Sequence, residues 1–166
     1  MLDHHAILLP TATRMLANLA AILAKGDSWA QQRGIDPAVL LASRLAPDMY
    51  PLVKQVQIVS DTCKGAAARL TGQSAPAFAD VEQSFAELQQ RLQRTQDYLA
   101  GFAAADFADA GARQIVLPWL PEQPLTGDAF LLHFALPNLY FHTSTAYAIL
   151  RHNGVPLGKP DYLGAL

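Results

Sequence analysis

The chain has 166 residues, of which 51% are hydrophobic and 16% are charged, and its formal net charge is −2. A chain of this length can bury a sizeable core, so we expect one domain over residues 1–166. The small negative charge, with Lys and Arg scattered singly along the chain, excludes the basic surface that nucleic acids and anionic membranes require.

Apolar residues at helical spacing predict a first long helix from about Leu9 to Gln32, which Gly34 ends. Asp36 is then a suitable N-cap, and the proline after it suits the first position of a helix. A short helix is therefore predicted through about Ser43.

The second and third long helices follow the same pattern. The second is predicted from about Asp48 to Leu70, with Gly72 as its stop, and a short linker leads to a third helix from about Phe78 to Ala100. The stripe of the third helix that we expect to face inward consists of Val81, Phe85, Leu88, Leu92, Thr95 and Leu99. The opposite face, which we interpret as solvated, consists of Glu82, Glu87, Gln89, Gln90, Arg91, Gln93 and Arg94.

Residues 102–127 do not continue the helical pattern of apolar residues and are instead rich in small residues and prolines. Segments 113–117 and 122–125 are typical of short strands, which predicts a small hairpin at about 112–126. Capping residues at 126–128 start a fourth long helix that runs through His152-Asn153 and stops at Gly154. Pro137 is expected to kink this helix, and residues 155–166 are expected to extend along the surface.

Four long helices, with a helix-free connection before the last one, predict an all-α fold, a four-helix bundle. The single cysteine, Cys63, excludes an intrachain disulfide and lies in an apolar pattern that favours a buried thiol. The first residues do not resemble a signal peptide, and no stretch reaches the roughly 18 uninterrupted apolar residues that span a bilayer. We therefore expect a cytoplasmic protein that does not enter a membrane.

The fourth helix carries the candidate site. Asn138 and His142 are four residues apart and share one helix face, which Thr145 extends. A neutral His142 could ligate a metal ion, but the asparagine amide is a poor ligand for transition metals, and we favour a buried polar pair that bonds to a neighbouring helix. His133 is nine residues before His142 and out of phase with it, so we expect it to be partly buried against another helix.

The second helix offers a further polar face, which Lys54, Gln57 and Asp61 share. If this face points inward, it places an amide and a carboxylate opposite His142, and Asp61 then needs a cationic partner. If it points outward, it is a solvated surface. The sequence leaves both alternatives open.

The chain also resembles a known family. The segments that carry the resemblance are Arg44-Leu-Ala-Pro-Asp-Met-Tyr-Pro-Leu52, Gln55-Val-Gln57, Ala67-Ala-Arg-Leu70 and His142 through Pro156. They resemble a bacterial family of unknown function within the DinB-like superfamily of four-helix bundles. This resemblance implies a bundle with a crossover connection and a homodimer.

Better-known members of that superfamily hold nickel or zinc with three histidines, one on the second helix and two that are four residues apart on the last. By this resemblance His142 matches the second histidine of the pair, and Asn138 occupies the place of the first. The matching region near Gln57 contains no histidine, and Thr145 stands where many members carry glutamine. One of the three implied ligands therefore remains.

Two functions follow as hypotheses. The first is a metal-free protein without a cofactor that binds an unknown small molecule, or is associated with stress, and has a polar pocket between the second and fourth long helices. Its candidate pocket residues are His142, Asn138, Gln57, Asp61, Lys54, Thr145 and His133. The alternative is a thiol-transferase-like enzyme that depends on nickel or zinc, with His142 as a metal ligand or general base.

Overall fold

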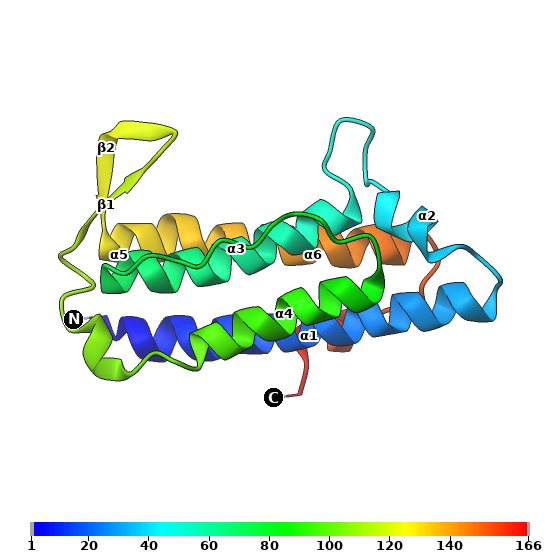
Figure 1. Ribbon diagram of the computed structural model, residues 1–166, viewed down its shortest axis with the longest axis horizontal. Helices are drawn as coiled ribbons and strands as arrows, with labels where there is room; N and C mark the ends of the chain where they lie inside the picture. Colours follow the sequence, from blue (N-terminus) through cyan, green and yellow to red (C-terminus); the bar gives the residue numbers. More distant parts are fainter. Residues whose placement is uncertain (1, 166) are drawn as a thin grey trace.

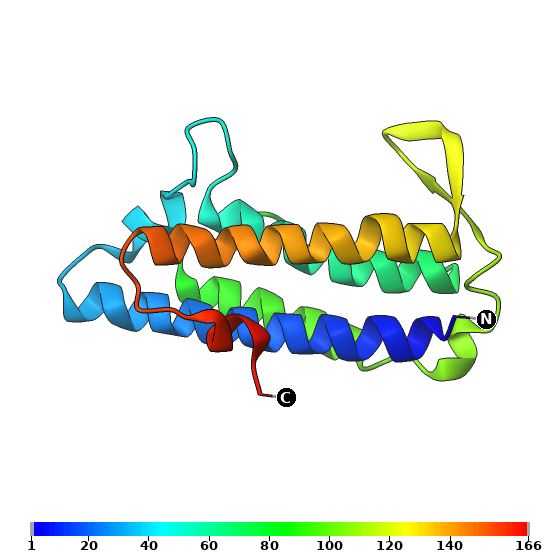
Figure 2. The ribbon, with the colours of Figure 1, turned by 180° about the vertical axis from the view of Figure 1, so that it is seen from behind.

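The structure is a computed structural model that describes residues 2–165. Its four longest helices are α1 (His4–Gln32), α3 (Leu52–Thr71), α4 (Phe85–Leu99) and α6 (Leu136–His152). They lie side by side along one axis (Figures 1 and 2), and α3 packs against both α4 and α6. The shorter elements are α2 (Pro37–Ala42), η1 (Ala104–Phe107), β1 (Gln114–Leu117), β2 (Leu120–Thr126), α5 (Gly127–Phe130), η2 (Leu131–Ala135) and α7 (Lys159–Leu163).

A long crossover separates the two middle helices. Figure 1 shows that α1 and α6 run in one direction along the body, while α3 and α4 run in the other. Two consecutive helices that are parallel need a connection that returns along their whole length, and residues 72–84 provide it. The crossover that the resemblance implied is therefore present.

The expectation of an all-α protein is correct only in part. Most residues are helical, but β1 and β2 form an antiparallel two-stranded sheet, with Ile115 opposite Leu125 and Leu117 opposite Leu120. The hairpin predicted at about 112–126 is this sheet. Ile115 and Leu117 alternate with exposed residues along β1, so that one face of this strand packs on the helices.

The predicted start of the third helix was wrong. The helix begins at Phe85 rather than near Phe78, because Ser84 accepts a hydrogen bond from the Glu87 amide and the Glu87 carboxylate accepts one from the Gln83 amide. Val81, which was expected to face inward, lies in the crossover and is 70% exposed. The short linker that we expected is in fact the long crossover.

Three other boundaries also differ from the prediction. The first helix starts at His4, where the Asp3 side chain caps the Ala6 amide. Pro51 is the N-cap of α3, so that helix begins a turn later than expected. The tail is not wholly extended, because it contains the short helix α7.

The turn before Pro137 is π-helical. Proline has no amide hydrogen to donate to the carbonyl of His133, and its ring crowds that carbonyl. The expected distortion of the helix therefore takes the form of a wide turn, η2, which continues directly into α6.

Helix α1 is long and apolar enough to cross a membrane by length and composition alone. The core helix of a helical protein meets the same criteria. Here Leu8, Leu16, Leu19 and Leu23 of α1 are buried in the shared core, where they pack with the other long helices.

Candidate functional site

Helix α3 presents polar side chains in two directions. Gln55 and Thr62 point to α6, where they meet the predicted site residues of the last long helix. Gln57 and Asp61 point to the crossover and α4. We call the first set of contacts the α3–α6 seam, defined by Gln55, Thr62, Asn138 and His142. The second set is the Arg91 cluster, defined by Gln57, Asp61, Asp80, Glu82 and Arg91.

The seam consists of two short hydrogen bonds between the helices. His142 Nδ1 lies 2.7 Å from Gln55 Oε1, and Asn138 Nδ2 donates to Thr62 Oγ1 over 2.7 Å. The predicted pair on α6 therefore bonds to a neighbouring helix, as the sequence indicated, but Asn138 and His142 are half-buried rather than buried. Its partners, Gln55 and Thr62, were not predicted.

The amide of Gln55 fixes the tautomer of His142. Gln55 is 1% exposed, and its Nε2 donates to the carbonyl oxygen of Tyr50 over 3.0 Å. Because that carbonyl can only accept, Gln55 Oε1 must face His142, and His142 Nδ1 must carry the hydrogen. Nε2 of His142 is then left with a lone pair.

The ring of His142 is half-buried, and burial lowers its pKa below the usual value. Histidine with a lowered pKa is neutral at pH 7, so the ring presents an acceptor nitrogen and no positive charge. Asn138 Oδ1 is a second acceptor one turn away, to which no side chain or amide in residues 2–165 donates. The seam therefore offers two acceptors to any group that approaches it.

The donor set of the seam does not fit a nickel or zinc centre. Such ions take three or four ligands, chiefly imidazole, thiolate or carboxylate. The seam has one imidazole, and its other members are two amides and a hydroxyl. Among residues 2–165 no group of three or more His, Cys, Asp and Glu side chains is placed to hold an ion.

Two predicted residues of α6 and η2 lie outside the seam. Thr145 is buried, but its hydroxyl donates to the carbonyl of Phe141 in its own helix. His133 is exposed, so the expectation that it packs against another helix was wrong. Its place in the wide turn η2 directs it to solvent rather than to α3.

The face of α3 with Lys54, Gln57 and Asp61 is neither opposite His142 nor free in solvent. Gln57 Nε2 donates to Glu82 Oε2 over 2.8 Å, and Lys54 pairs with Asp80. Asp61 accepts from Arg91 Nη2 over 2.9 Å. These residues hold the crossover against α3. The face therefore points neither to His142 nor to solvent, the two alternatives that the sequence left open, but to the crossover and α4.

Arg91 was interpreted as part of a solvated face, and this was wrong. Its side chain is 1% exposed and bonds to Asp61, Asp80 and Glu82 at 2.9, 3.1 and 2.9 Å. A guanidinium can serve several carboxylates at once because its five N–H groups point in different directions. Arg91 therefore joins α3, α4 and the crossover.

Two carboxylates of the Arg91 cluster, Asp80 and Glu82, remain ionised. Burial acts to raise the pKa of Glu82, but hydrogen bonds from Arg91 and Gln57 outweigh it and lower that pKa. Burial also acts to raise the pKa of Asp80, but Lys54 and Arg91 outweigh it and lower that pKa. A carboxylate that is held ionised by cations is a poor general acid or base at pH 7, so we assign the cluster a structural role.

Cys63 is fully enclosed in the core, as the sequence indicated. Burial raises the pKa of its thiol to about 12. Since the thiolate is the reactive form, Cys63 is not a nucleophile near neutral pH.

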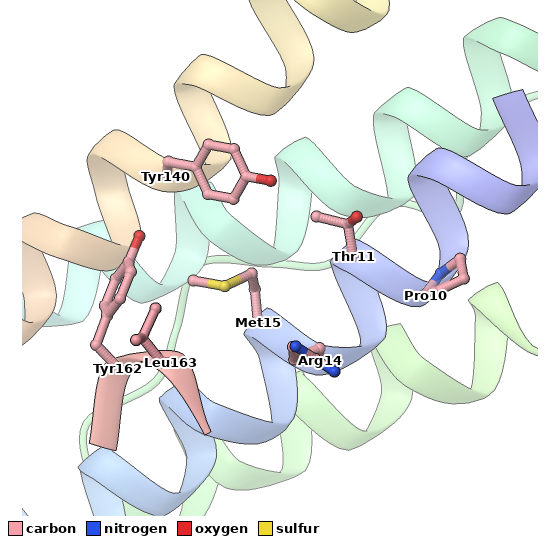
Figure 3. Close-up of a pocket in the computed structure, with 7 residues that line it drawn as sticks. All are labelled: Pro10, Thr11, Arg14, Met15, Tyr140, Tyr162 and Leu163. Carbon is pink, nitrogen blue, oxygen red and sulfur yellow. The ribbon is translucent and has the colours of Figure 1, made fainter. Parts of the chain in front are cut away.

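A surface cleft that the sequence did not predict lies between α1, α6 and α7 (Figure 3). Its volume is about 420 Å³, within the range typical of small-molecule sites. The residues that line it are Pro10, Thr11, Arg14, Met15, Tyr140, Tyr162 and Leu163. The cleft could not be predicted from an extended tail, because the short helix α7 within the tail forms one wall of the cleft.

Comparison with known proteins agrees with this architecture. Residues 4–163 match a family described as "Domain of unknown function (DUF1993)". A crystal structure described as a DinB family member protein from Shewanella denitrificans is 49% identical, with a TM-score of 0.94 over 98% of this chain and 92% of that chain. No curated protein matches the chain.

Proposed function

From the premise that this chain belongs to the DUF1993 family, within the DinB-like superfamily, we propose that it is a metal-free protein that binds a small molecule. Its scaffold is the DinB-like four-helix bundle. The proposed pocket is polar and lies at the α3–α6 seam. Because His142 Nε2 and Asn138 Oδ1 are both acceptors, the ligand is one that donates hydrogen bonds, such as an amine, a hydroxyl or an amide N–H.

The observation that carries this proposal is the bond between His142 Nδ1 and Gln55 Oε1. In this bond the Gln55 amide fixes the orientation of a neutral imidazole ring, whereas the alternative function needs a charged or metal-bound ring. The alternative is a thiol-transferase-like enzyme with nickel or zinc. For this function the seam supplies one suitable metal ligand, His142. Association with stress would be a setting for the binding protein rather than a separate mechanism.

Metal analysis and ligand screening of untagged protein test the proposal together. We expect far less than one nickel or zinc ion per chain, unchanged in His142→Ala. We also expect small amines or polyols to shift the NMR signals of Asn138 and His142, and Asn138→Ala to weaken this binding about tenfold or less, the share of one or two hydrogen bonds.

His152→Ala is the matched control, because His152 is also on α6 but is exposed in its last turn. It should change neither metal content nor binding. A stoichiometric metal ion that disappears in His142→Ala, but not in His152→Ala, would support the enzyme instead.

We further propose that the protein is a homodimer. The low charged fraction of the chain and the exposed aromatic side chains of Phe141 and Trp119, 56% and 63% exposed, support a covered surface. Light scattering should give twice the mass of the chain, and a monomeric mass at micromolar concentration would contradict the dimer.

A further inference from the structure

The cleft between α1, α6 and α7 is separate from the α3–α6 seam, and it has its own chemistry. On α1 its residues are spaced as one helix face, with Pro10, Thr11, Arg14 and Met15 in successive turns. Figure 3 shows the Tyr140 ring reaching from α6 over the cleft toward α1. Tyr140 and Asn138 are two residues apart on α6, so they lie on nearly opposite sides of that helix.

The wall that α7 supplies is fixed mainly by polar contacts. Asn18 Nδ2 donates to the carbonyl of Tyr162 over 2.9 Å, and Ser144 Oγ donates to the Tyr162 hydroxyl over 3.1 Å. Lys25 pairs with Asp161 at 2.5 Å. No residue of α7 is buried, so this wall stands beside the cleft without filling it.

The interior of the cleft is apolar. Met15 is 6% exposed and forms the floor, while the rings of Tyr140 and Tyr162 and the side chain of Leu163 form the sides (Figure 3). Thioether and aromatic groups adapt well to flat or flexible apolar molecules. An aromatic or alkyl body of a ligand therefore fits this part.

The polar groups at the cleft favour a negative charge. Arg14 is exposed and makes no ion pair within residues 2–165, and no carboxylate lines the cleft. The hydroxyl of Thr11 makes no hydrogen bond to any described side chain or backbone group, so it is available as a second donor. An unpaired guanidinium beside an apolar floor is suited to bind a carboxylate.

We propose that this cleft binds an amphipathic monocarboxylate, with the carboxylate on Arg14 and the apolar body over Met15 between Tyr140 and Tyr162. This site does not depend on the ligand proposed for the α3–α6 seam. A donor-rich ligand at the seam and a carboxylate in the cleft can succeed or fail separately.

A pair of matched probes tests the proposal by NMR titration of the whole protein: 4-phenylbutyrate and its uncharged amide, 4-phenylbutyramide. We expect both to bind in the cleft, with the carboxylate about three- to tenfold tighter because of its charge-assisted hydrogen bonds. Backbone signals of residues 11–15, 140 and 162–163 should shift most.

Arg14→Gln should remove the preference for the carboxylate and leave the amide unaffected. Arg151→Gln is the matched control, since Arg151 is exposed in the last turn of α6 and outside the cleft, and it should keep the preference. Leu163→Asp adds a negative charge to a wall residue that is 40% exposed, and it should weaken the carboxylate more than the amide.

Equal affinities of the wild-type protein for the two probes, or the absence of binding, would overturn the proposal. So would a preference that survives Arg14→Gln. Arg14 also borders a wider hollow of about 660 Å³ between α1 and α4. Shifts confined to Gln93, Asp97 and Phe102 of that hollow would place the probe there and contradict the assigned site.

Discussion

Replacing Arg91 with leucine is expected to lower the free energy of unfolding by about 2–4 kcal/mol. The change removes the common partner of Asp61, Asp80 and Glu82. Asp61 and Asp80 are 43% and 35% exposed, so water can solvate them again, and we discount their share accordingly. Glu82 is 9% exposed and carries most of the penalty. Denaturant unfolding followed by circular dichroism measures the loss.

The matched control for this change is Arg94→Leu. Arg94 lies on the same helix but is exposed, and its one described aromatic contact is with Phe78, at 4.1 Å from the ring centroid. Its replacement should cost about 1 kcal/mol or less. Arg91→Lys should fall between the two, because an ammonium group cannot reach three carboxylates as a guanidinium does. Equal stability of Arg91→Leu and Arg94→Leu would contradict the structural role of Arg91.

The same cluster sets an expected pH dependence. The pKa values of Asp80 and Glu82 are lowered in the folded protein, so the folded state binds fewer protons than the unfolded chain in acid. Their contribution to stability is complete above the unfolded pKa values, about 3.9 and 4.3, and is lost as the pH falls through the lower folded values. Arg91→Leu should therefore lose less stability than the wild-type protein between neutral pH and acid.

Replacing Gly127 with alanine is also expected to destabilise the fold, by about 2–4 kcal/mol. A Cβ at this position would stand 1.7 Å from the carbonyl oxygen of Ala110 and 2.7 Å from its carbon. Both are backbone atoms, so no side chain can rotate away to make room. Gly127 begins α5, which leads through η2 into α6, and a shift here should also displace Asn138 and His142.

Gly158→Ala is the control for this effect, because its Cβ would meet only Pro160 Cδ at an ordinary 3.5 Å. Thermal unfolding should separate the two variants clearly. NMR signals of His142 should move in Gly127→Ala and stay in place in Gly158→Ala. A Gly127→Ala protein as stable as Gly158→Ala would contradict the close packing of α5 on residue 110.

The sequence predicted most helices because their apolar periodicity is local information. It predicted the hairpin for the same reason. The start of α4 was missed although Ser84 and Glu87 form a recognisable capping pair, because Val81 happens to continue the apolar stripe. A stripe shows which positions would face inward if the segment were helical, and the cap decides where the helix begins.

The sequence predicted the seam residues of α6 but not their partners on α3. Spacing alone places Asn138 and His142 on one face of α6, and the structure shows that face against α3. The partner face of α3 could not be chosen, because its rotation depends on contacts with α4 and the crossover. Gln55 and Gln57 are two residues apart, so they point in nearly opposite directions on the same helix.

Arg91 was missed for a related reason. In the sequence it belongs to the most polar face of its helix, and polar faces are usually solvated. Its partners are 9 to 30 residues away, on the crossover and on α3. Only the return of residues 72–84 along the body brings these charges together, and no local pattern encodes that return.

The ring of His142 in untagged protein tests the account most directly. Long-range ¹H–¹⁵N NMR spectra distinguish the two neutral tautomers, the imidazolium and a zinc-bound ring. We predict a neutral ring with hydrogen on Nδ1 at pH 7, unchanged when one equivalent of Zn²⁺ is added. A protonated ring, or nitrogen shifts that show zinc coordination at His142, would contradict a seam built from neutral hydrogen bonds.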